Sequence, residues 1–244
     1  MRPEIGAFRM GLDKRWTNTI DTSLNDPGAR IYDATIQTIV TEYNTRLEKT
    51  PDYGPADWKL IRAMAWVESG GPKAAAWNAR VMQIGNSGDP GYSALQKHEG
   101  ATTAVVAKAT LDKLAAVRPG QINDPLFNIE VGIAYVWVRL CKTDVGTIVD
   151  DPALRDHTVA KGGEIASNLA RAEGTTLSDL REANPGVNLD RLKGGDVLHF
   201  HKSHTGRRIV GWYSFTADNI ARKYNVGDPA YADKLRYVMS KINW

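Results

Sequence analysis

Apolar residues recur every three or four positions along much of the chain, which is the pattern of helices with one buried face. Residues 29–49 follow an expected turn at Asp26–Ala29 and carry such a stripe, so we expect a helix packed on the core there. Residues 57–69 carry a second stripe, which begins after Asp57 as the expected N-cap and stops at Gly70-Gly71-Pro72. The stripes consist of Tyr32, Ile36, Ile39, Tyr43 and Leu47 in the first segment, and of Trp58, Ile61, Met64 and Ala65 in the second.

Two more helices are expected in the middle of the chain. The Ala-rich stretch Thr102–Val117 predicts one of them. Asp124 then supplies an N-cap and Pro125 a first helical position for the next, which runs to about residue 142. That segment is apolar on nearly all sides, which is typical of a helix at the centre of a core. Within it, Gly132 predicts a close approach of backbones, and a buried Asn128 needs hydrogen-bond partners.

Glu68 continues the apolar stripe of the second helix, three residues after Ala65. Burial penalises an ionised carboxylate, and the negative end of the helix dipole adds to that penalty in the last turn. Both effects raise the pKa of Glu68 toward the range that a general acid needs near neutral pH. The alternative is an ordinary helix-terminal glutamate that turns into solvent.

Composition narrows the function classes. The chain has 244 residues with a formal net charge of +3, and no basic block that would favour nucleic-acid binding. Cys141 is the single cysteine, so no disulfide forms within the chain. The sequence shows no signal peptide and no integral membrane segment, and it suggests no cofactor.

Short motifs in a fixed order between residues 57 and 140 resemble those of the soluble lytic transglycosylases, which share the goose-type lysozyme fold. Those enzymes typically show Glu-Ser, then Gly-Leu-Met-Gln, then Asn-Ile with Gly and Tyr on a buried helix. This chain departs from the pattern at Arg80-Val81, where Gly-Leu is usual. The matching residues are Glu68, Ser69, Met82, Gln83, Ile84, Asp124, Pro125, Asn128, Ile129, Gly132 and Tyr135.

A second match lies near the end of the chain, where residues 220–238 resemble the final motif of the same family, Ala-x-Tyr-Asn-x-Gly followed by a Tyr and a helix. Tyr224, Asn225, Gly227 and Tyr231 occupy those places. We therefore expect residues 204–244 to return as a helical segment that completes the catalytic cleft opposite Glu68.

The resemblance implies cleavage of the β-1,4 bond between N-acetylmuramic acid and N-acetylglucosamine in peptidoglycan. Glu68 would protonate the glycosidic oxygen and then act as a base while the muramic 6-hydroxyl attacks the anomeric carbon. The product is a 1,6-anhydro sugar, and one carboxyl group suffices, unlike the usual two-carboxylate scheme. The substrate-binding residues implied are Ser69, Met82, Gln83, Asn128, Tyr135, Tyr224 and Asn225.

Structural roles stay open for some of these residues. Met82 is also suited to filling a core, and Ser69 to ending a helix. Asp89 follows the Met-Gln motif and is a candidate second carboxylate for a hydrolase. However, Gly88-Asp89-Pro90-Gly91 is good turn chemistry, and we favour the turn.

Residues 156–203 change character, with a short strand, two short helices and a closing strand expected. They resemble a LysM domain, a small βααβ module that binds N-acetylglucosamine, although Gly163 and Glu164 stand where Asp-Thr is usual. Thr176 is the expected N-cap of the second helix, with Asp179 in an approximate capping box. His199, His201 and His204 lack a completing ligand set, so we expect no metal site. The implied glycan-binding residues are Gly162, Gly163, Glu164, Ile165, Asn184 and Pro185.

The expected architecture is a mainly α, lysozyme-like catalytic domain with a small α+β LysM module. Its parts are residues 1–155, the module at 156–203, and 204–244. The expected function is that of a lytic transglycosylase held on peptidoglycan glycan strands, in the periplasm or cell wall. An immunity protein or a secretion-machine component is a further expected partner, with delivery as an antibacterial effector or a phage endolysin. The alternatives are a hydrolytic muramidase on the same fold and a non-catalytic wall-binding protein.

Overall fold

The computed structural model describes residues 11–118 and 122–242, and it is mainly α-helical with one two-stranded antiparallel sheet. The chain divides into two compact units. The helical unit consists of the residues up to Lys142 together with those from Ile209 onward, and the inserted unit is Thr143–Arg208. The inserted unit therefore begins and ends outside the expected limits of 156 and 203.

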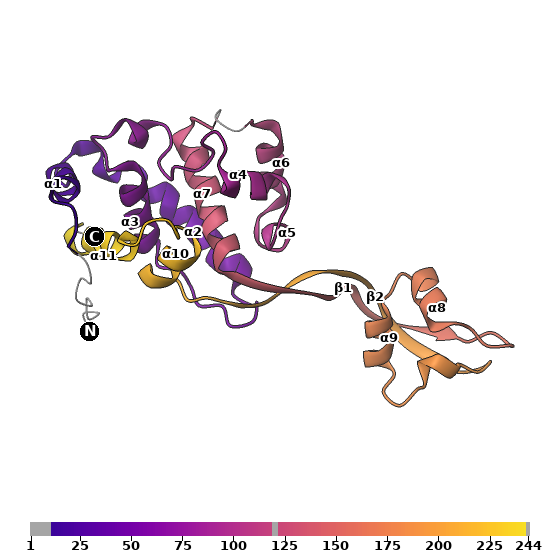
Figure 1. The fold of residues 1–244 in the computed structure, drawn as a ribbon. Coiled ribbons are helices and arrows are strands. Elements are labelled where there is room, and N and C mark those ends of the chain that lie inside the picture. The colour runs from indigo at the N-terminus through magenta and orange to yellow at the C-terminus, as the bar shows by residue number, and fades with distance from the viewer. Residues whose placement is uncertain (1–10, 119–121, 243–244) are drawn as a thin grey trace. The chain divides into compact units, whose positions relative to one another are not determined.

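The helical unit is built from helices that meet around one core. They are α1 (Lys14–Ser23), α2 (Asp33–Leu47), α3 (Trp58–Ser69), α4 (Pro90–Gln96), α5 (Thr102–Val105), α6 (Lys108–Ala116), α7 (Pro125–Leu140), α10 (Ala217–Lys223) and α11 (Tyr231–Lys241), with 3-10 turns at Pro27–Arg30 and Ala75–Asn78. In Figure 1, α10 and α11 lie against α7 and α3 although they are far from them in sequence.

The predicted helix ends in this unit are largely confirmed. Asp57 caps α3 by accepting from the Lys59 N–H, and Gly70 ends that helix in the left-handed conformation. Asp124 caps α7 by accepting from the Phe127 N–H, with Pro125 in the first turn. The first stripe is also on the core side of α2, although that helix begins at Asp33, after a 3-10 turn, rather than at residue 29.

The single helix expected over Thr102–Val117 is wrong. Val106 takes an extended conformation between α5 and α6, and Ala107 begins the second helix. Val105 and Val106 are both buried in the core. Consecutive helical positions point about 100° apart, so a break in the helix lets both valines face inward.

The inserted unit has its own core and a long two-stranded ribbon. Its elements are β1 (Cys141–Thr158), α8 (Ala166–Glu173), α9 (Leu177–Ala183), a 3-10 turn at Leu189–Arg191 and β2 (Val197–Trp212), so the first and last residues of the strands belong to the helical unit. The core is formed by Val159, Ala166, Leu169, Ala170, Leu180, Leu189, Leu192, Leu198 and Phe200.

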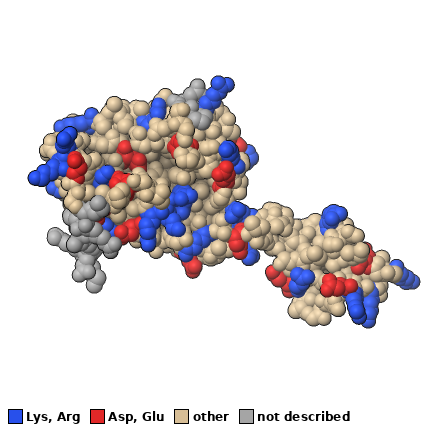
Figure 2. Space-filling view, viewed as in Figure 1, with Lys and Arg blue, Asp and Glu red and all other residues tan. Residues whose placement is uncertain are grey.

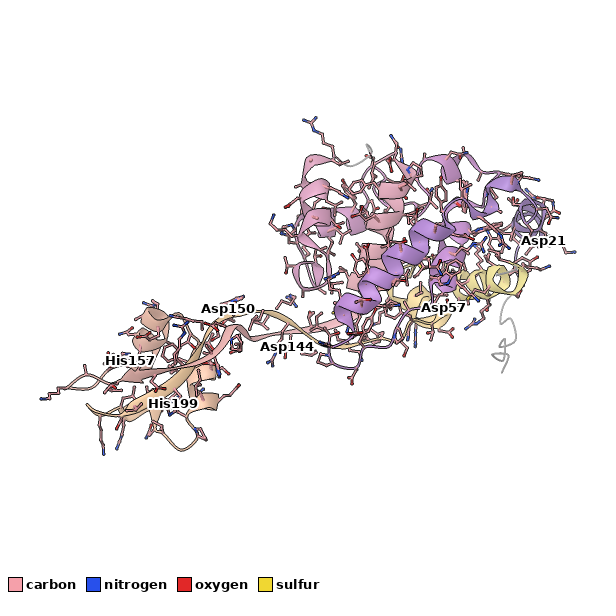
Figure 3. The ribbon with its side chains drawn as sticks, turned by 180° about the vertical axis from the view of Figure 1, so that it is seen from behind. Asp21, Asp57, Asp144, Asp150, His157 and His199 are labelled. Carbon is pink, nitrogen blue, oxygen red and sulfur yellow. The ribbon has the colours of Figure 1, made fainter. Side chains whose placement is uncertain are left out.

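Both strands are longer than the sequence led us to expect. Cross-strand polar pairs stabilise them, as such pairs do in antiparallel ribbons. The Arg208 Nε donates to Asp144 at 2.9 Å, and the His204 Nδ1 lies 2.9 Å from an Asp150 oxygen. Figure 3 labels Asp144, Asp150, His157 and His199 in this unit.

Two properties of the described residues are relevant to the kinds of partner that the chain could bind. On the face shown in Figure 2, basic and acidic side chains of the described residues are interspersed. None of the helices in the described part of the chain has the length and apolarity needed to cross a bilayer.

Candidate active site

A cavity of about 370 Å³ in the helical unit brings together residues that are distant in sequence. Six of the expected site residues line it, from the end of α3, the loop after Arg80, α7 and the α10–α11 turn. They are Glu68, Met82, Gln83, Tyr135, Tyr224 and Asn225, and the remaining lining residues are Ile84, Asn86, Ser87, Gly88, Asp89, Pro90 and Gly91.

Glu68 is partly buried at this cavity and receives neutral hydrogen-bond donors. The Tyr231 hydroxyl donates to Glu68 Oε1 at 2.5 Å, and Asn225 also hydrogen-bonds the carboxylate. Burial raises the pKa of Glu68 to about 7, although these two hydrogen bonds and the more distant Lys234 oppose the rise. Asp228 adds to the rise by charge repulsion. A carboxyl group with this pKa both donates and accepts a proton near neutral pH.

Tyr231 is the site residue that sequence reasoning did not assign. It belongs to the final motif, but the helical pattern gives it only as a buried position of α11. Burial, followed by the neighbouring Glu68 charge, raises its pKa well above the usual value, so its hydroxyl is a hydrogen-bond donor at ordinary pH. A tyrosine at the first position of a helix that follows Asn and Gly is the signal that points to this role.

Tyr224 holds the loop and the C-terminal segment together. Its hydroxyl donates to the Met82 carbonyl at 3.2 Å. Its ring lies 5.6 Å from that of Tyr135 and 6.3 Å from that of Tyr231, measured between centroids. Tyr135 of α7, Tyr224 at the end of α10 and Tyr231 of α11 thus pack in a row near the cavity, an arrangement suited to a ligand with both polar and apolar faces.

Asn128 is fully buried and supports the site from behind; it is not among the residues that line the cavity. Its Oδ1 accepts from the Met82 N–H at 2.8 Å, and its Nδ2 donates to the Ile84 carbonyl at 2.8 Å. A Cβ at Gly132 would lie 2.3 Å from that of Met82, which confirms the close backbone approach. Asn128 and Gly132 therefore fix the loop that carries Met82 and Gln83.

Ser69 ends α3 and does not reach the cavity. Its hydroxyl donates to the Ala65 carbonyl at 2.6 Å and accepts from the Gly71 N–H at 3.1 Å. The residue is buried, so both hydrogen-bonding functions are used within the helix end. The structure thus supports the helix-ending role over the substrate-binding one.

Asp89 lines the cavity as well, but its oxygens are engaged by the backbone. Oδ2 accepts from the Gly85 N–H at 2.7 Å, and Oδ1 accepts from Gly91 at 2.8 Å and Tyr92 at 3.3 Å. Asp89 is the N-cap of α4. Asp89 therefore has a structural role, but as a helix cap rather than in the expected turn, since the helix begins at Pro90. Glu68 is the one acid of the described lining whose carboxylate is not held by backbone N–H groups.

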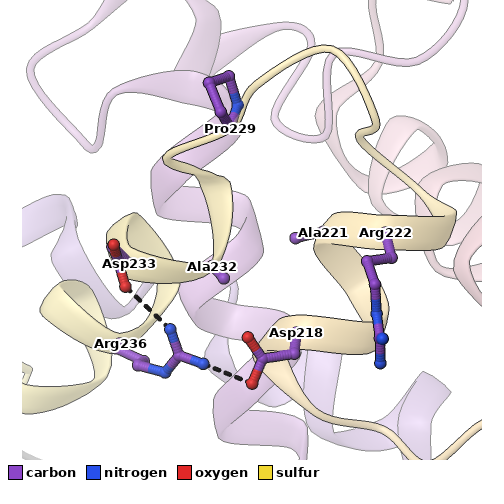
Figure 4. A pocket seen from close by; sticks show the side chains of 7 residues that line it. All are labelled: Asp218, Ala221, Arg222, Pro229, Ala232, Asp233 and Arg236. Atoms are coloured by element: carbon purple, nitrogen blue, oxygen red, sulfur yellow. Dashed lines mark hydrogen bonds and ion pairs between the residues drawn. The ribbon is translucent and has the colours of Figure 1, made fainter. Parts of the chain in front are cut away.

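The α10–α11 pair is held together next to the site. Arg236 of α11 pairs with Asp218 of α10 and, at 2.9 Å, with Asp233 of its own helix (Figure 4). These carboxylates raise the pKa of Arg236, the Asp218 hydrogen bond being the main cause. A cavity of about 510 Å³ lies beside this cluster. The cluster joins the two helices on either side of the turn that carries Asn225, and Tyr231 begins the second of them.

In the inserted unit, the residues expected to bind glycan have mixed roles. Gly162, Ile165 and Pro185 are exposed, whereas Asn184 is buried and exchanges hydrogen bonds with the His199 backbone. The Glu164 carboxylate accepts from the Ala160 N–H at 3.0 Å and lies 2.8 Å from the His157 Nε2. A Cβ at Gly163 would lie 3.0 Å from the Leu192 carbonyl oxygen.

The inserted unit also contains a cavity that the sequence did not indicate. It has a volume of about 690 Å³ and lies between the ribbon and the α8–α9 connection. Its lining includes Thr147, Ser167, Thr175, Thr176 and Ser203 and is therefore rich in hydroxyl groups. The expected glycan-binding residues do not line this cavity.

The capping box expected at α9 is half formed. Thr176 accepts from the Asp179 N–H at 3.1 Å, but the Thr176 N–H donates to the Ser203 hydroxyl. Asp179 turns to β2 instead, where it accepts from the His201 N–H at 2.6 Å and pairs with the His201 ring.

The three histidines of β2 each contact a separate carboxylate. His199 pairs with Asp156, His201 with Asp179 and His204 with Asp150. Within the described residues, no group of three or more histidine, cysteine or acidic side chains is placed to hold a metal ion.

Comparison with protein-family models, curated proteins and solved structures found no match to this chain. The functional assignment therefore depends on the residues and their geometry. Its basis is a single acid with a pKa near neutrality, two hydrogen-bond donors on it, and a cavity large enough for a ligand.

Proposed function

We propose that this chain is a peptidoglycan-cleaving lytic transglycosylase, with a lysozyme-like helical unit and a LysM-like inserted unit. The observation that carries the proposal is Glu68, a partly buried carboxyl with a pKa of about 7, hydrogen-bonded by Tyr231 and facing a cavity. The ordered sequence motifs supply the substrate class. The substrate is the β-1,4 bond between N-acetylmuramic acid and N-acetylglucosamine.

The proposed reaction needs one carboxyl group. Protonated Glu68 donates its proton to the glycosidic oxygen, so the bond to the muramic anomeric carbon breaks and the glucosamine 4-hydroxyl leaves. The resulting carboxylate then takes the proton of the muramic 6-hydroxyl while that oxygen bonds to the anomeric carbon. Glu68 ends protonated again, no water is consumed, and the product is a 1,6-anhydro sugar.

The hydrogen bonds at the site support this cycle. Tyr231 and Asn225 stabilise the carboxylate form between the two proton transfers without being charged themselves. Tyr224 and Asn128 hold the Met82–Ile84 loop at the other side of the cavity. The lining then orients the sugar chain relative to Glu68.

The inserted unit is proposed to bind N-acetylglucosamine of the same polymer, through the loop at Gly162–Ile165 and the loop after Asn184. Covalent linkage to the helical unit would raise the local concentration of substrate without changing the chemistry. The proposed site of action is the periplasm or cell wall. An immunity protein or a component of a secretion machine is a further proposed partner.

A hydrolytic muramidase is the second candidate, because Asp89 lines the same cavity as Glu68. The three backbone hydrogen bonds that Asp89 accepts favour a structural role, and so favour the intramolecular attack.

Digestion of purified sacculi, followed by mass spectrometry of the released muropeptides, tests both proposals. We expect anhydro-muramic ends from the native chain and none from Glu68→Gln. Reducing ends would show hydrolysis instead. A native chain that binds sacculi but never cleaves them would establish the non-catalytic alternative.

A further inference from the structure

A small cavity lies on the side of α3 that faces away from Glu68. Arg62 and Trp66 line it, and Glu68, two residues after Trp66, points roughly 200° around the helix from Trp66. The volume is about 240 Å³. The lining residues are Leu24, Asn25, Ala29, Arg30, Arg62, Trp66, Lys241 and Ile242, a set with three cations and no carboxylate among the described residues.

Arg62 lies at the base of this cavity with 2% of its side chain exposed. Its Nε lies 2.7 Å from an Asp33 oxygen, and its Nη2 donates to the Ala29 carbonyl at 3.1 Å. Burial, and then repulsion by Arg30, lower the pKa of Arg62, while Asp33 opposes them. Arg30 is therefore close enough to act on Arg62.

Lys241 brings a third positive charge to the cavity from the end of α11. Its Nζ lies 3.4 Å from an Asp21 oxygen, and its side chain is 40% exposed. The charged groups at the cavity are thus Arg30, Arg62 and Lys241, with Asp33 and Asp21 behind two of them. Three cations and two carboxylates leave a net charge of +1 at this cavity, which favours an anion there.

The indole N–H of Trp66 is a second and independent observation. The side chain is buried, with 1% exposed, and its Nε1 has no hydrogen-bond partner among the described residues. A buried donor without an acceptor destabilises the fold, so such a group needs an explanation. An anion in the cavity that Trp66 lines would supply the acceptor.

We propose that this cavity binds a phosphate group, with Arg30 and Lys241 at its rim and Arg62 and the Trp66 N–H at its base. The several cationic donors at this cavity suit an anion with several acceptor oxygens, such as phosphate, better than a carboxylate with two. The cavity of about 240 Å³ has room for a phosphate group. This site is separate from Glu68 and does not depend on the proposed glycan cleavage.

The test is a titration of the full chain with inorganic phosphate at constant ionic strength, followed by NMR of the indole N–H groups. The Trp66 signal is assigned with Trp66→Phe. We expect that signal to move in a saturable way. The Trp137 N–H, which donates to the Tyr53 hydroxyl, serves as the internal reference and should stay in place.

Variants at the rim define the site. Arg30→Leu and Lys241→Met should each weaken phosphate binding by about tenfold, the loss typical of one charge-assisted contact. Lys108→Met is the matched control, because Lys108 is 86% exposed and pairs with Asp112 away from the cavity. That control should bind phosphate as the native chain does.

Three results would overturn the proposal: a Trp66 signal that does not saturate, rim variants that bind like the control, and acetate that binds as tightly as phosphate. If Trp66→Phe does not fold, the thermal midpoint replaces the NMR assignment. Phosphate should then raise the midpoint of the native chain and of Lys108→Met, and raise it less for Lys241→Met. An equal rise in all three would equally contradict the site.

Discussion

Glu68 in the helical unit and Glu164 in the inserted unit are both partly buried glutamates, but they have opposite surroundings. Glu68 accepts from the neutral groups of Tyr231 and Asn225, and burial dominates, so its pKa rises to about 7. Glu164 is paired with His157 and accepts from the Ala160 N–H, and these contacts, the His157 hydrogen bond first, lower its pKa. The environment decides whether a carboxylate exchanges protons or stays charged.

Lys234, whose charge acts on Glu68, shows how this difference arises. The Lys234 Nζ lies 2.7 Å from an Asp228 oxygen, so the cation is paired with another carboxylate rather than with Glu68. Among the described residues, Glu68 therefore receives hydrogen bonds only from neutral donors, which stabilise its ionised form but do not prevent protonation near neutral pH. A carboxyl used as acid and then base needs this intermediate condition, whereas one with a structural role is best held by a cation.

Removing the acid should have the largest effect. Glu68→Gln keeps the size of the side chain but cannot donate the proton, so we expect cleavage of sacculi to fall by about 10²–10⁴-fold. Release of muropeptides measures this. Glu164→Gln is the matched control, since it removes a carboxylate from the inserted unit, and it should leave the rate at saturating substrate unchanged. Equal losses in both variants would contradict the comparison.

Removing the Tyr231 hydroxyl, which donates to Glu68, should have a smaller effect on the cleavage rate, and that effect should depend on pH. The Tyr231 hydrogen bond lowers the pKa of Glu68, so Tyr231→Phe should raise that pKa further. Activity that requires protonated Glu68 falls as pH rises through this pKa, and in the variant that fall should move to higher pH. We also expect about a tenfold lower rate at the optimum, from lost stabilisation of the carboxylate. Tyr213→Phe, a tyrosine of the helical unit outside the cavity lining, is the control for the pH profile.

The sequence predicted the positions of many site residues, because local patterns determine them. The stripe of α3 and its caps placed Glu68 in the last turn, and the apolar all-round pattern of α7 placed Asn128 and Gly132 inside. The sequence left two roles open for Ser69, and it did not predict which groups Asn128 would contact. The partners of Ser69 are the nearby backbone groups of Ala65 and Gly71, whereas those of Asn128 are the Met82 and Ile84 backbone groups, which are more than 40 residues away in sequence.

The contact between Tyr231 and Glu68 joins residues 163 positions apart, and no local pattern contains that information. The sequence analysis also underestimated the length of the two strands, where charged pairs such as Arg208 with Asp144 join residues 64 positions apart. The sequence analysis did not predict the cavity that Trp66 lines, because its three cations come from separate segments of the chain.

Loss of the support behind the loop should reduce stability and activity together. Asn128→Ala leaves the Met82 N–H and the Ile84 carbonyl without their partner in a buried place, and should lower the free energy of unfolding by roughly 3 kcal/mol. Urea denaturation of the full chain measures this. Asn188→Ala, at an exposed 3-10 cap of the inserted unit, should cost much less. An equal cost would show that Asn128 does not hold the loop.

The smallest effect should be found in the inserted unit, where His157 lies between Glu164 and Glu173. These two carboxylates, the Glu164 hydrogen bond first, raise the pKa of His157 above its unfolded value. The stabilisation is therefore fully present below the unfolded pKa of histidine and is lost as pH rises through the higher folded pKa. The lowered pKa of Glu164 sets the acid limit of this stabilisation, because the stability that ionised Glu164 contributes is lost as pH falls through that pKa. Both groups are charged in the folded and unfolded chain between roughly pH 4.5 and 6.5.

Hydrogen exchange of the Phe200 amide in the full chain reports on the stability of this unit, since Phe200 belongs to its core. After correction for the intrinsic pH dependence of exchange, protection should be about twofold greater at pH 6 than at pH 8, the size expected of an ion pair that water still reaches. His157→Gln should remove that difference, while His98→Gln, in the helical unit, should retain it. A pH dependence that persists in His157→Gln would mean that the other histidine–carboxylate pairs of β2 cause it. Glu164 would then not be held in its charged form by His157, and the contrast with Glu68 would fail.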